Sequence, residues 1–151
     1  MILEELETPC LILDKGILER NLRRMSETVR RNGAQLRPHL KTAKSAQVAR
    51  MATTGEAGGI TVSTLAEAEY FADHGFRDIF VAAALPPRKL DRAARLIDKG
   101  VSVTLVTDDI AGAAAIAAHP ASFSALIEID SGDHRAGVDR AREGRHAGTA
   151  G

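Results

Sequence analysis

Aromatic residues are nearly missing from this sequence of 151 residues: they account for 3% of it, and tryptophan does not occur. A chain with 44% hydrophobic residues can still bury a core, which must then consist mainly of Ala, Val, Ile and Leu. Such a core suits an α/β fold, in which strands buried on both faces are short aliphatic runs. The single cysteine, Cys10, cannot form an internal disulfide. Because it lies in the apolar stretch Pro9 to Leu13, we expect it to be a small buried core residue.

The sequence also lacks an excess of charge of either sign, since 20 Lys and Arg residues balance 20 Asp and Glu residues. This balance argues against a nucleic-acid partner and against a membrane surface, both of which favour a basic excess. No apolar run approaches the roughly 20 residues that a transmembrane helix needs, and the N-terminus does not resemble a signal peptide. We therefore expect a cytoplasmic protein.

Short apolar runs alternate along the chain with segments of helical periodicity. The runs expected to be strands are residues 9–13, 36–40, 60–63, 79–84, 101–106 and 123–130. Helices are expected over residues 17–29, 45–51, 64–75, 87–99 and 109–118. Asp14 suits an N-cap, and Thr64 to Glu67 form a capping box at the start of the third helix. Strands separated by helices in this way predict parallel βαβ units with right-handed crossovers.

Two folds contain such units, an open doubly wound sheet and a (β/α)8 barrel. The sequence has neither a Gly-x-Gly-x-x-Gly motif after the first expected strand nor a Walker-type loop, so the barrel is favoured. A complete barrel takes about 250 residues and eight strands. We therefore predict a partial (β/α)8 TIM barrel over residues 1–138 of a truncated chain. Residues 139–151, rich in Arg, Ala and Gly, show no helix or strand pattern, and we expect an atypical, disordered tail.

The most informative segment, Leu36 to Thr42, contains three potential cations. Strand side chains alternate between faces, so Arg37, His39 and Lys41 share one face, which in a barrel would be the interior near the C-terminal end. Buried cations need an anion, and a phosphate-bearing cofactor would supply one. Desolvation and neighbouring positive charge would favour the neutral amine of Lys41, the form that reacts with a carbonyl group. The alternative is an edge strand whose polar face lies in water.

A second polar segment, Glu128 to Val138, follows the last expected strand. Glu128 and Asp130 share a face and could form ion pairs with the cationic strand. Arg135 could hold a phenolate or a carboxylate with its planar guanidinium. Equally, the segment could be a solvated polar turn. No His, Cys and Asp residues have metal-ligand spacing, so no metal site is expected in the chain.

Four segments together carry a resemblance to a known family. They are Arg37-Pro38-His39-Leu40-Lys41-Thr42, Glu128 to Val138, Thr8 to Asp14, and Ile60 to Glu69. In their order and composition they resemble the D-threonine aldolase/D-serine dehydratase family, which belongs to the alanine-racemase-like, fold-type III pyridoxal-phosphate enzymes. The resemblance covers nearly everything up to Val138.

By this resemblance, Lys41 is the expected catalytic residue, carrying pyridoxal 5'-phosphate as a Schiff base and acting as general base on the substrate. His39 and Arg37 would support the ring and the lysine, and Arg135 would hydrogen-bond the ring oxygen. The cofactor would act as the electron sink, while the protein supplies orientation and electrostatics. The resemblance implies a lyase that acts on small D-configured hydroxy amino acids, and it leaves a homo-oligomer open.

The chain departs from the family in two respects. Family members often have Lys-Thr-His-Lys where this sequence has Lys41-Thr42-Ala43-Lys44, so any role of that histidine is absent. The divalent metal site of full-length members lies near the C-terminus of a longer chain, so we expect it to be absent here. Two alternatives to a lyase therefore remain: a non-catalytic module that binds pyridoxal phosphate, and an inactive truncated remnant.

Overall fold

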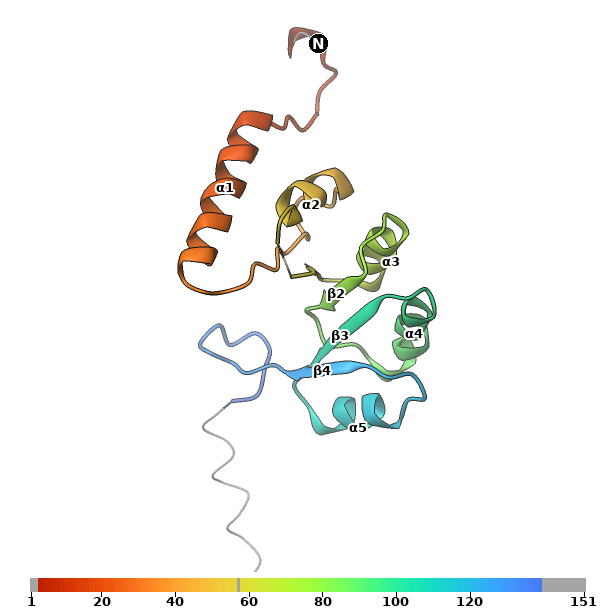
Figure 1. The fold of residues 1–151 in the computed structure, drawn as a ribbon. Helices are drawn as coiled ribbons and strands as arrows, with labels where there is room; N and C mark the ends of the chain where they lie inside the picture. Colours follow the sequence, from red (N-terminus) through yellow and green to blue (C-terminus); the bar gives the residue numbers. More distant parts are fainter. Residues whose placement is uncertain (1–2, 57, 140–151) are drawn as a thin grey trace, which may run out of the picture.

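The fold is an α/β arrangement in which helices and parallel strands alternate (Figure 1). The computed structural model describes residues 3–56 and 58–139. Its α-helices are α1 (Lys15–Arg31), α2 (Ala46–Thr53), α3 (Leu65–Asp73), α4 (Leu90–Asp98) and α5 (Ile110–Ala118). Its strands are β1 (Ile60–Val62), β2 (Asp78–Val81), β3 (Ser102–Thr107) and β4 (Ser124–Ile127). Two short 3-10 helices, Leu3–Glu5 and Pro87–Lys89, complete the elements of the described residues.

The four strands form one parallel sheet whose spatial order is the chain order, β1-β2-β3-β4. A helix follows each of the first three strands and leads to the next one. A doubly wound sheet reverses its strand order at a switch point, whereas a barrel adds strands in one direction. No reversal occurs in the described part of the sheet, and the expected partial barrel is confirmed.

The sheet differs from the prediction at its N-terminal side. Residues 36–40 contribute one parallel bridge, between His39 and Thr61, instead of a full strand. Residues 9–13 form no strand, and Cys10 is exposed, so both expectations for this stretch were wrong. The side chain of Leu11 is completely exposed, at 104%. The reason is that a strand needs a neighbour for its hydrogen bonds, and within residues 3–56 and 58–139 nothing pairs with this stretch.

The hydrophobic core lies between the sheet and the helices α3 and α4. One face of the strands contributes residues that are at most 3% exposed: Ile60, Val62, Ile79, Val81, Val103 and Leu105. Phe71 of α3 and Leu96 of α4 pack against them and are themselves fully buried. The register aligns Val62 with Val81, and Val81 with Leu105, so this face consists of rows of aliphatic side chains. The core is therefore aliphatic, as the composition predicts.

The helices begin where the capping signals predict. The carboxylate of Asp14 accepts a hydrogen bond from the backbone N–H of Ile17 at 2.8 Å, and the hydroxyl of Thr64 accepts one from the N–H of Glu67 at 3.1 Å. The carboxylate of Glu67 reaches back to the backbone N–H of Ser63 at 2.8 Å. The first two contacts satisfy donors that the first helical turn leaves free, and the third fixes the backbone just before the N-cap. These helix starts are therefore encoded locally.

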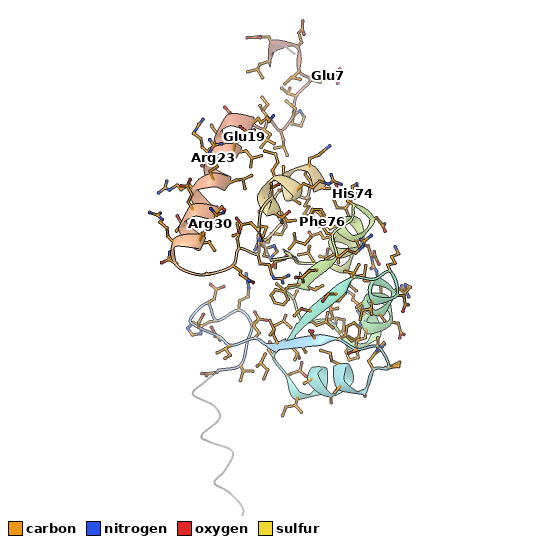
Figure 2. All side chains as sticks on the ribbon, viewed as in Figure 1. Glu7, Glu19, Arg23, Arg30, His74 and Phe76 are labelled. Carbon is orange, nitrogen blue, oxygen red and sulfur yellow. The ribbon has the colours of Figure 1, made fainter. Side chains whose placement is uncertain are left out.

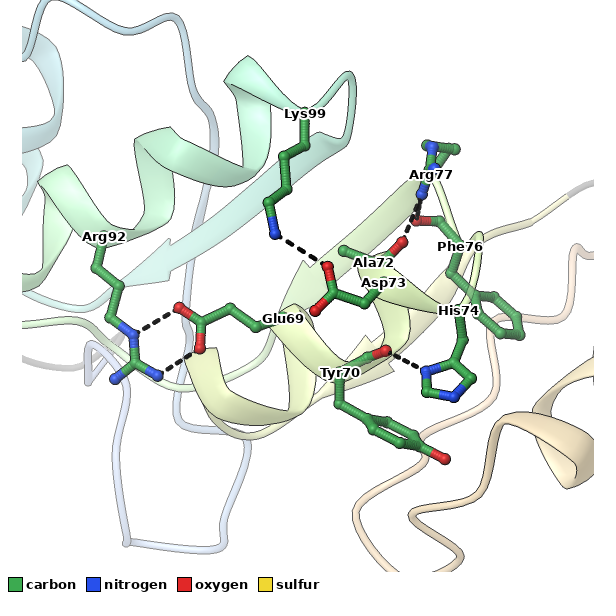
Figure 3. A network of polar contacts seen from close by, with 9 residues as sticks. All are labelled: Glu69, Tyr70, Ala72, Asp73, His74, Phe76, Arg77, Arg92 and Lys99. Atoms are coloured by element: carbon green, nitrogen blue, oxygen red, sulfur yellow. Dashed lines mark hydrogen bonds and ion pairs between the residues drawn. The ribbon is translucent and has the colours of Figure 1, made fainter.

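Two ion pairs join the outer sides of α3 and α4 (Figure 3). Arg92 donates to both carboxylate oxygens of Glu69, with Nε 2.7 Å from Oε1, and the amine of Lys99 lies 2.9 Å from Asp73. The Arg92 hydrogen bonds hold the pKa of Glu69 below its usual value against the opposing effect of burial.

Helix α1 lies apart from the sheet, and Figure 2 shows charged side chains such as Arg23 and Arg30 along it. None of the described helices combines the length and apolar character needed to cross a bilayer.

Candidate functional site

The residues around Lys41 lie at the edge where the parallel strands end. His39 forms its bridge with Thr61 of β1, so their side chains share the sheet face that α3 and α4 do not cover. Burial alternates as the strand pattern predicts: Leu40 is buried in the helix-side core, while Arg37, His39 and Lys41 are exposed. Lys41 follows the bridge immediately and opens a turn. The alternation of burial along residues 37–41 therefore agrees with the prediction that the three polar side chains share one face.

The amine of Lys41 makes no hydrogen bond or ion pair with any residue in the described part of the chain. The neighbouring Lys44 differs, because its amine lies 3.3 Å from a carboxylate oxygen of Glu67. The backbone N–H of Lys41 donates to Nδ1 of His39 at 3.3 Å, which places the imidazole directly beneath the turn. Among the residues that the structure describes, Lys41 thus presents an unpaired amine at the C-terminal edge of the sheet.

The surroundings of His39 favour its neutral form. Burial lowers its pKa from the usual value, the positive charge of Lys41 lowers it further, and the Glu67 carboxylate opposes both effects. Only a neutral imidazole can accept a hydrogen bond at Nδ1, so the contact with the Lys41 backbone agrees with the direction of the shift. The ring can therefore serve as an uncharged, partly apolar surface beside the amine.

Arg37 lies at the opposite end of the same face. Its guanidinium binds both carboxylate oxygens of Asp78, the first residue of β2, at 2.9 and 2.7 Å, and contacts the carbonyl oxygen of Ile60 at 3.4 Å. A Cβ atom at Gly59 would lie 2.2 Å from the Asp78 carbonyl oxygen, so this close approach requires glycine. The structure brings His39 and Lys41 together, and it separates Arg37 from the edge that carries them.

The second polar segment forms a loop held at both ends. The Asp130 carboxylate accepts hydrogen bonds from the backbone N–H groups of Gly132 and His134, at 2.8 and 3.1 Å, and lies 2.9 Å from His134 Nδ1. These contacts, the Gly132 N–H first among them, lower the pKa of Asp130. Ile129 and Val138 form a parallel bridge at the base of the loop. Arg135 is exposed, and its guanidinium lies 3.9 Å from Asp133.

The expected ion pairs between this loop and the cationic strand do not form in the described residues. Asp130 instead pairs with His134 of its own loop. The carboxylates that meet the cations are Asp78, which binds Arg37, and Glu67, which binds Lys44. Both partners come from other elements, and spacing in the sequence does not reveal them. The capping box identified Glu67 as a helix-start residue but gave no sign of its ion pair.

The described residues contain no group of three or more His, Cys, Asp or Glu side chains that could hold a metal ion. What the edge does offer is a primary amine, a neutral imidazole beside it and an arginine on the loop that follows β4. An unpaired amine at the C-terminal end of parallel strands can react with an aldehyde, because barrel sites of this kind are open to ligands there.

Comparison with known proteins gives consistent matches. The family model described as "Alanine racemase, N-terminal domain" matches residues 13–148. The chain is 42% identical over 137 residues to D-threo-3-hydroxyaspartate dehydratase of Delftia sp. (strain HT23), covering 88% of this chain. It is 38% identical over 140 residues to 3-hydroxy-D-aspartate aldolase of Paracoccus denitrificans, covering 89% of this chain.

Solved structures agree with these matches. The Delftia dehydratase superposes with a TM-score of 0.85 at 41% identity, over 89% of this chain and 37% of that one. D-threonine aldolase from Filomicrobium marinum superposes with a TM-score of 0.82 at 30% identity, over 91% of this chain and 38% of that one. The chain spans about 36% of the length of the Delftia dehydratase and of the Paracoccus aldolase.

Proposed function

Because the chain belongs to the alanine racemase N-terminal domain family, among the relatives of D-threonine aldolase and D-serine dehydratase, we propose that it forms the part of a lyase that binds pyridoxal 5'-phosphate. The proposed substrates are D-configured β-hydroxy amino acids. Relatives named as dehydratases and aldolases of 3-hydroxyaspartate support a hydroxyaspartate as the first candidate. The relatives' names also support two reaction types, loss of water and carbon–carbon cleavage.

The observation that carries the proposal is the amine of Lys41, which has no partner within residues 3–56 and 58–139 and lies beside His39, whose pKa is lowered. The donor set suits an aldehyde that carries an aromatic ring: the amine can form a covalent bond, and the uncharged imidazole can contact the ring. Lys44, three residues away, is bound to Glu67 and is less free to react. The residues present therefore fit the covalent and ring-contacting parts of a pyridoxal-phosphate site.

Each predicted residue then has a distinct task. Lys41 would hold the cofactor and, once released by the substrate, move a proton at the α-carbon or the hydroxyl group. His39 would orient the ring, and Arg135 would hydrogen-bond the ring oxygen from the loop after β4. Arg37, bound to Asp78, would fix the segment that leads to His39 and Lys41. The bound cofactor supplies the electron-withdrawing ring that makes such a proton acidic.

A trapping experiment tests the cofactor site. The purified chain is incubated with pyridoxal phosphate, reduced with borohydride and digested, and modified lysines are located by mass spectrometry. We expect the adduct at Lys41, because its amine has no partner among the described residues and lies beside the His39 imidazole at the C-terminal edge of the sheet. Lys41→Ala should abolish it together with any visible absorbance band. The matched control is Lys89→Ala, which removes an exposed lysine of the 3-10 helix before α4 and should leave the adduct unchanged.

The alternatives separate in the same samples. An adduct spread evenly over the lysines would contradict a specific site and favour an inactive remnant. A specific Lys41 adduct without turnover of D-threo-3-hydroxyaspartate would favour a module that binds the cofactor without catalysis. Formation of oxaloacetate and ammonia would identify a dehydratase, and formation of glyoxylate and glycine would identify an aldolase.

A further inference from the structure

The turn that carries Lys41 has an unusual backbone. It is closed by a hydrogen bond from the N–H of Lys44 to the carbonyl oxygen of Leu40, at 2.9 Å. Lys44 has a φ of 45°, in the left-handed region that residues with a side chain seldom adopt. Such a conformation persists where surrounding contacts determine it. The turn therefore depends on contacts from outside the segment.

Glu67 in the first turn of α3 supplies the main contact. Its side chain is only 11% exposed, and one oxygen lies 3.3 Å from the amine of Lys44. The other oxygen accepts the backbone N–H of Ser63 at 2.8 Å. Burial by itself would raise the pKa of Glu67, but the hydrogen bonds from Ser63 and Lys44 outweigh it and hold the pKa below its usual value. The carboxylate therefore stays charged and keeps its cation.

A second contact from the same helix holds the other side of the turn. The hydroxyl of Tyr70 accepts a hydrogen bond from the backbone N–H of Ala46, the first residue of α2, at 3.2 Å. Ala46 is itself 3% exposed. Helix α3 thus contacts the chain at Lys44, through Glu67, and at Ala46, through Tyr70. Lys41 lies just before this anchored segment.

We propose that Glu67 and Lys44 are positioning residues for Lys41: their ion pair fixes the turn of residues 41–44 and thereby the direction of the Lys41 amine. Neither residue touches the cofactor in this role. The Glu67 charge also acts on His39, whose ring lies beneath the Lys41 backbone, so lysine, imidazole and ion pair form one cluster. The reactivity of Lys41 rests on the function proposed above. The effect of the ion pair on the order of the turn is independent of that function.

A set of variants tests the proposal by hydrogen exchange. Lys44→Asn removes the amine but keeps a residue that tolerates the left-handed region. Faster amide exchange in this variant would then result from the missing ion pair and not from backbone strain in the turn. Glu67→Gln removes the charge from the other side, and the double variant completes a cycle. In either single variant, the amide protons of residues 44 and 46 should exchange roughly fivefold faster, the scale of one ion pair. The double variant should add little, and Lys44→Arg should restore slow exchange.

The same variants are then assayed for borohydride-trapped pyridoxal phosphate at Lys41, with the amides of β3 and the circular dichroism spectrum as controls for global folding. Trapping at Lys41 should fall several-fold in both single variants and return in Lys44→Arg. Unchanged exchange in the single variants, or purely additive effects in the double variant, would overturn the proposal. So would faster exchange with undiminished trapping. If the unaltered chain gives no Lys41 adduct, the proposed function fails, and the exchange measurements still decide whether the ion pair holds the turn.

Discussion

Lys41 and Lys44 show how differently two lysines of one short segment can be placed. Both are surrounded by similar residue types in the sequence, and both are exposed. Lys44 is bound to a carboxylate that lies 23 positions further along the chain, whereas Lys41 has no partner in the described residues. An unpaired amine is the one that can give up its proton and attack a carbonyl group. At the scale of single residues, tertiary contacts therefore distinguish two lysines that the sequence places three positions apart.

The conformation of the loop after β4 should depend on glycine at position 137. Its φ is 103°, and an added Cβ would lie 2.5 Å from the backbone nitrogen of Asp130. Gly137→Ala should therefore cost about 1–3 kcal/mol locally, through backbone strain and the forced shift of Asp130. The measurement is hydrogen exchange of the Val138 amide, which bonds the carbonyl oxygen of Glu128 at 2.8 Å.

Gly132→Ala is the matched control in the same loop. Gly132 has a φ of 125°, so it carries a backbone penalty as well, but nothing lies within 4 Å of its added Cβ. Gly132→Ala should therefore accelerate hydrogen exchange of the Val138 amide less than Gly137→Ala does. Equal effects would show that backbone strain alone, without the contact to Asp130, explains the need for glycine.

At the scale of elements, the contact between α3 and α4 should depend on pH. Hydrogen bonds from Arg92 hold the pKa of Glu69 below its usual value in the folded chain. A lowered carboxylate pKa contributes stability above the unfolded pKa, and this contribution is lost as the pH falls through the folded pKa. Glu69→Gln should thus lower the free energy of unfolding at pH 7, and the difference from the unaltered chain should vanish in acid.

Urea denaturation at a series of pH values checks this expectation. Asp73→Asn provides the comparison, because the Asp73–Lys99 pair joins the same two helices but lies more exposed, with side-chain exposures of 60% and 55%. Solvent screens such a pair strongly, so its removal should change stability less. A Glu69→Gln difference that persists unchanged at low pH would contradict the role assigned to the Arg92 contact.

The helices were predicted more accurately than the strands, for a reason that lies in their hydrogen bonds. Asp14 and Thr64 satisfy donors within their own first turn, so the helix start is visible in a few adjacent letters. A strand needs a partner from elsewhere. The stretch from Pro9 to Leu13 has an apolar strand pattern but pairs with nothing in the described residues. Its pattern alone could not decide its conformation.

At the scale of the whole molecule, the two faces of the sheet are unequal. Helices α3 and α4 cover one face, where Leu96 is 1% exposed, while Leu126 of β4 is 53% exposed. Leu96→Ala removes buried atoms and leaves a cavity, so it should cost about 2–5 kcal/mol of unfolding free energy. Leu126→Ala should cost about 0.5 kcal/mol or less, since little is buried there.

Midpoints and slopes of urea unfolding curves of both variants test this asymmetry. Equal losses for Leu96→Ala and Leu126→Ala would show that Leu126 is buried in solution, by a second copy of the chain or by another partner. A loss confined to Leu96→Ala would show that the core between the sheet and α3 and α4 carries the stability of the described part.

The sequence indicated candidate residues for the site but not the contacts that hold them. Alternation along a strand placed His39 and Lys41 on one face, and the resemblance to a pyridoxal-phosphate family singled out Lys41. The same alternation placed Arg37 on this face as well. In the structure, however, Arg37 lies further from the C-terminal edge than Lys41 and binds Asp78. The position of a residue along the strand direction depends on the pairing register with the neighbouring strands. Asp78 and Glu67 remained unseen as partners because each lies on another element.

The sequence by itself determined the alternation of helices and strands, the aliphatic core and the family, because periodicity, capping residues and motifs are local or ordered properties of the chain. The tertiary structure alone decided which charges meet. The packing of the strands and helices brings Asp78 to Arg37 and Glu67 to Lys44, and it leaves Lys41 beside His39 without a partner in the part of the chain that the structure describes. Electrostatic contacts act over a few ångströms in space, and separation along the chain says little about them.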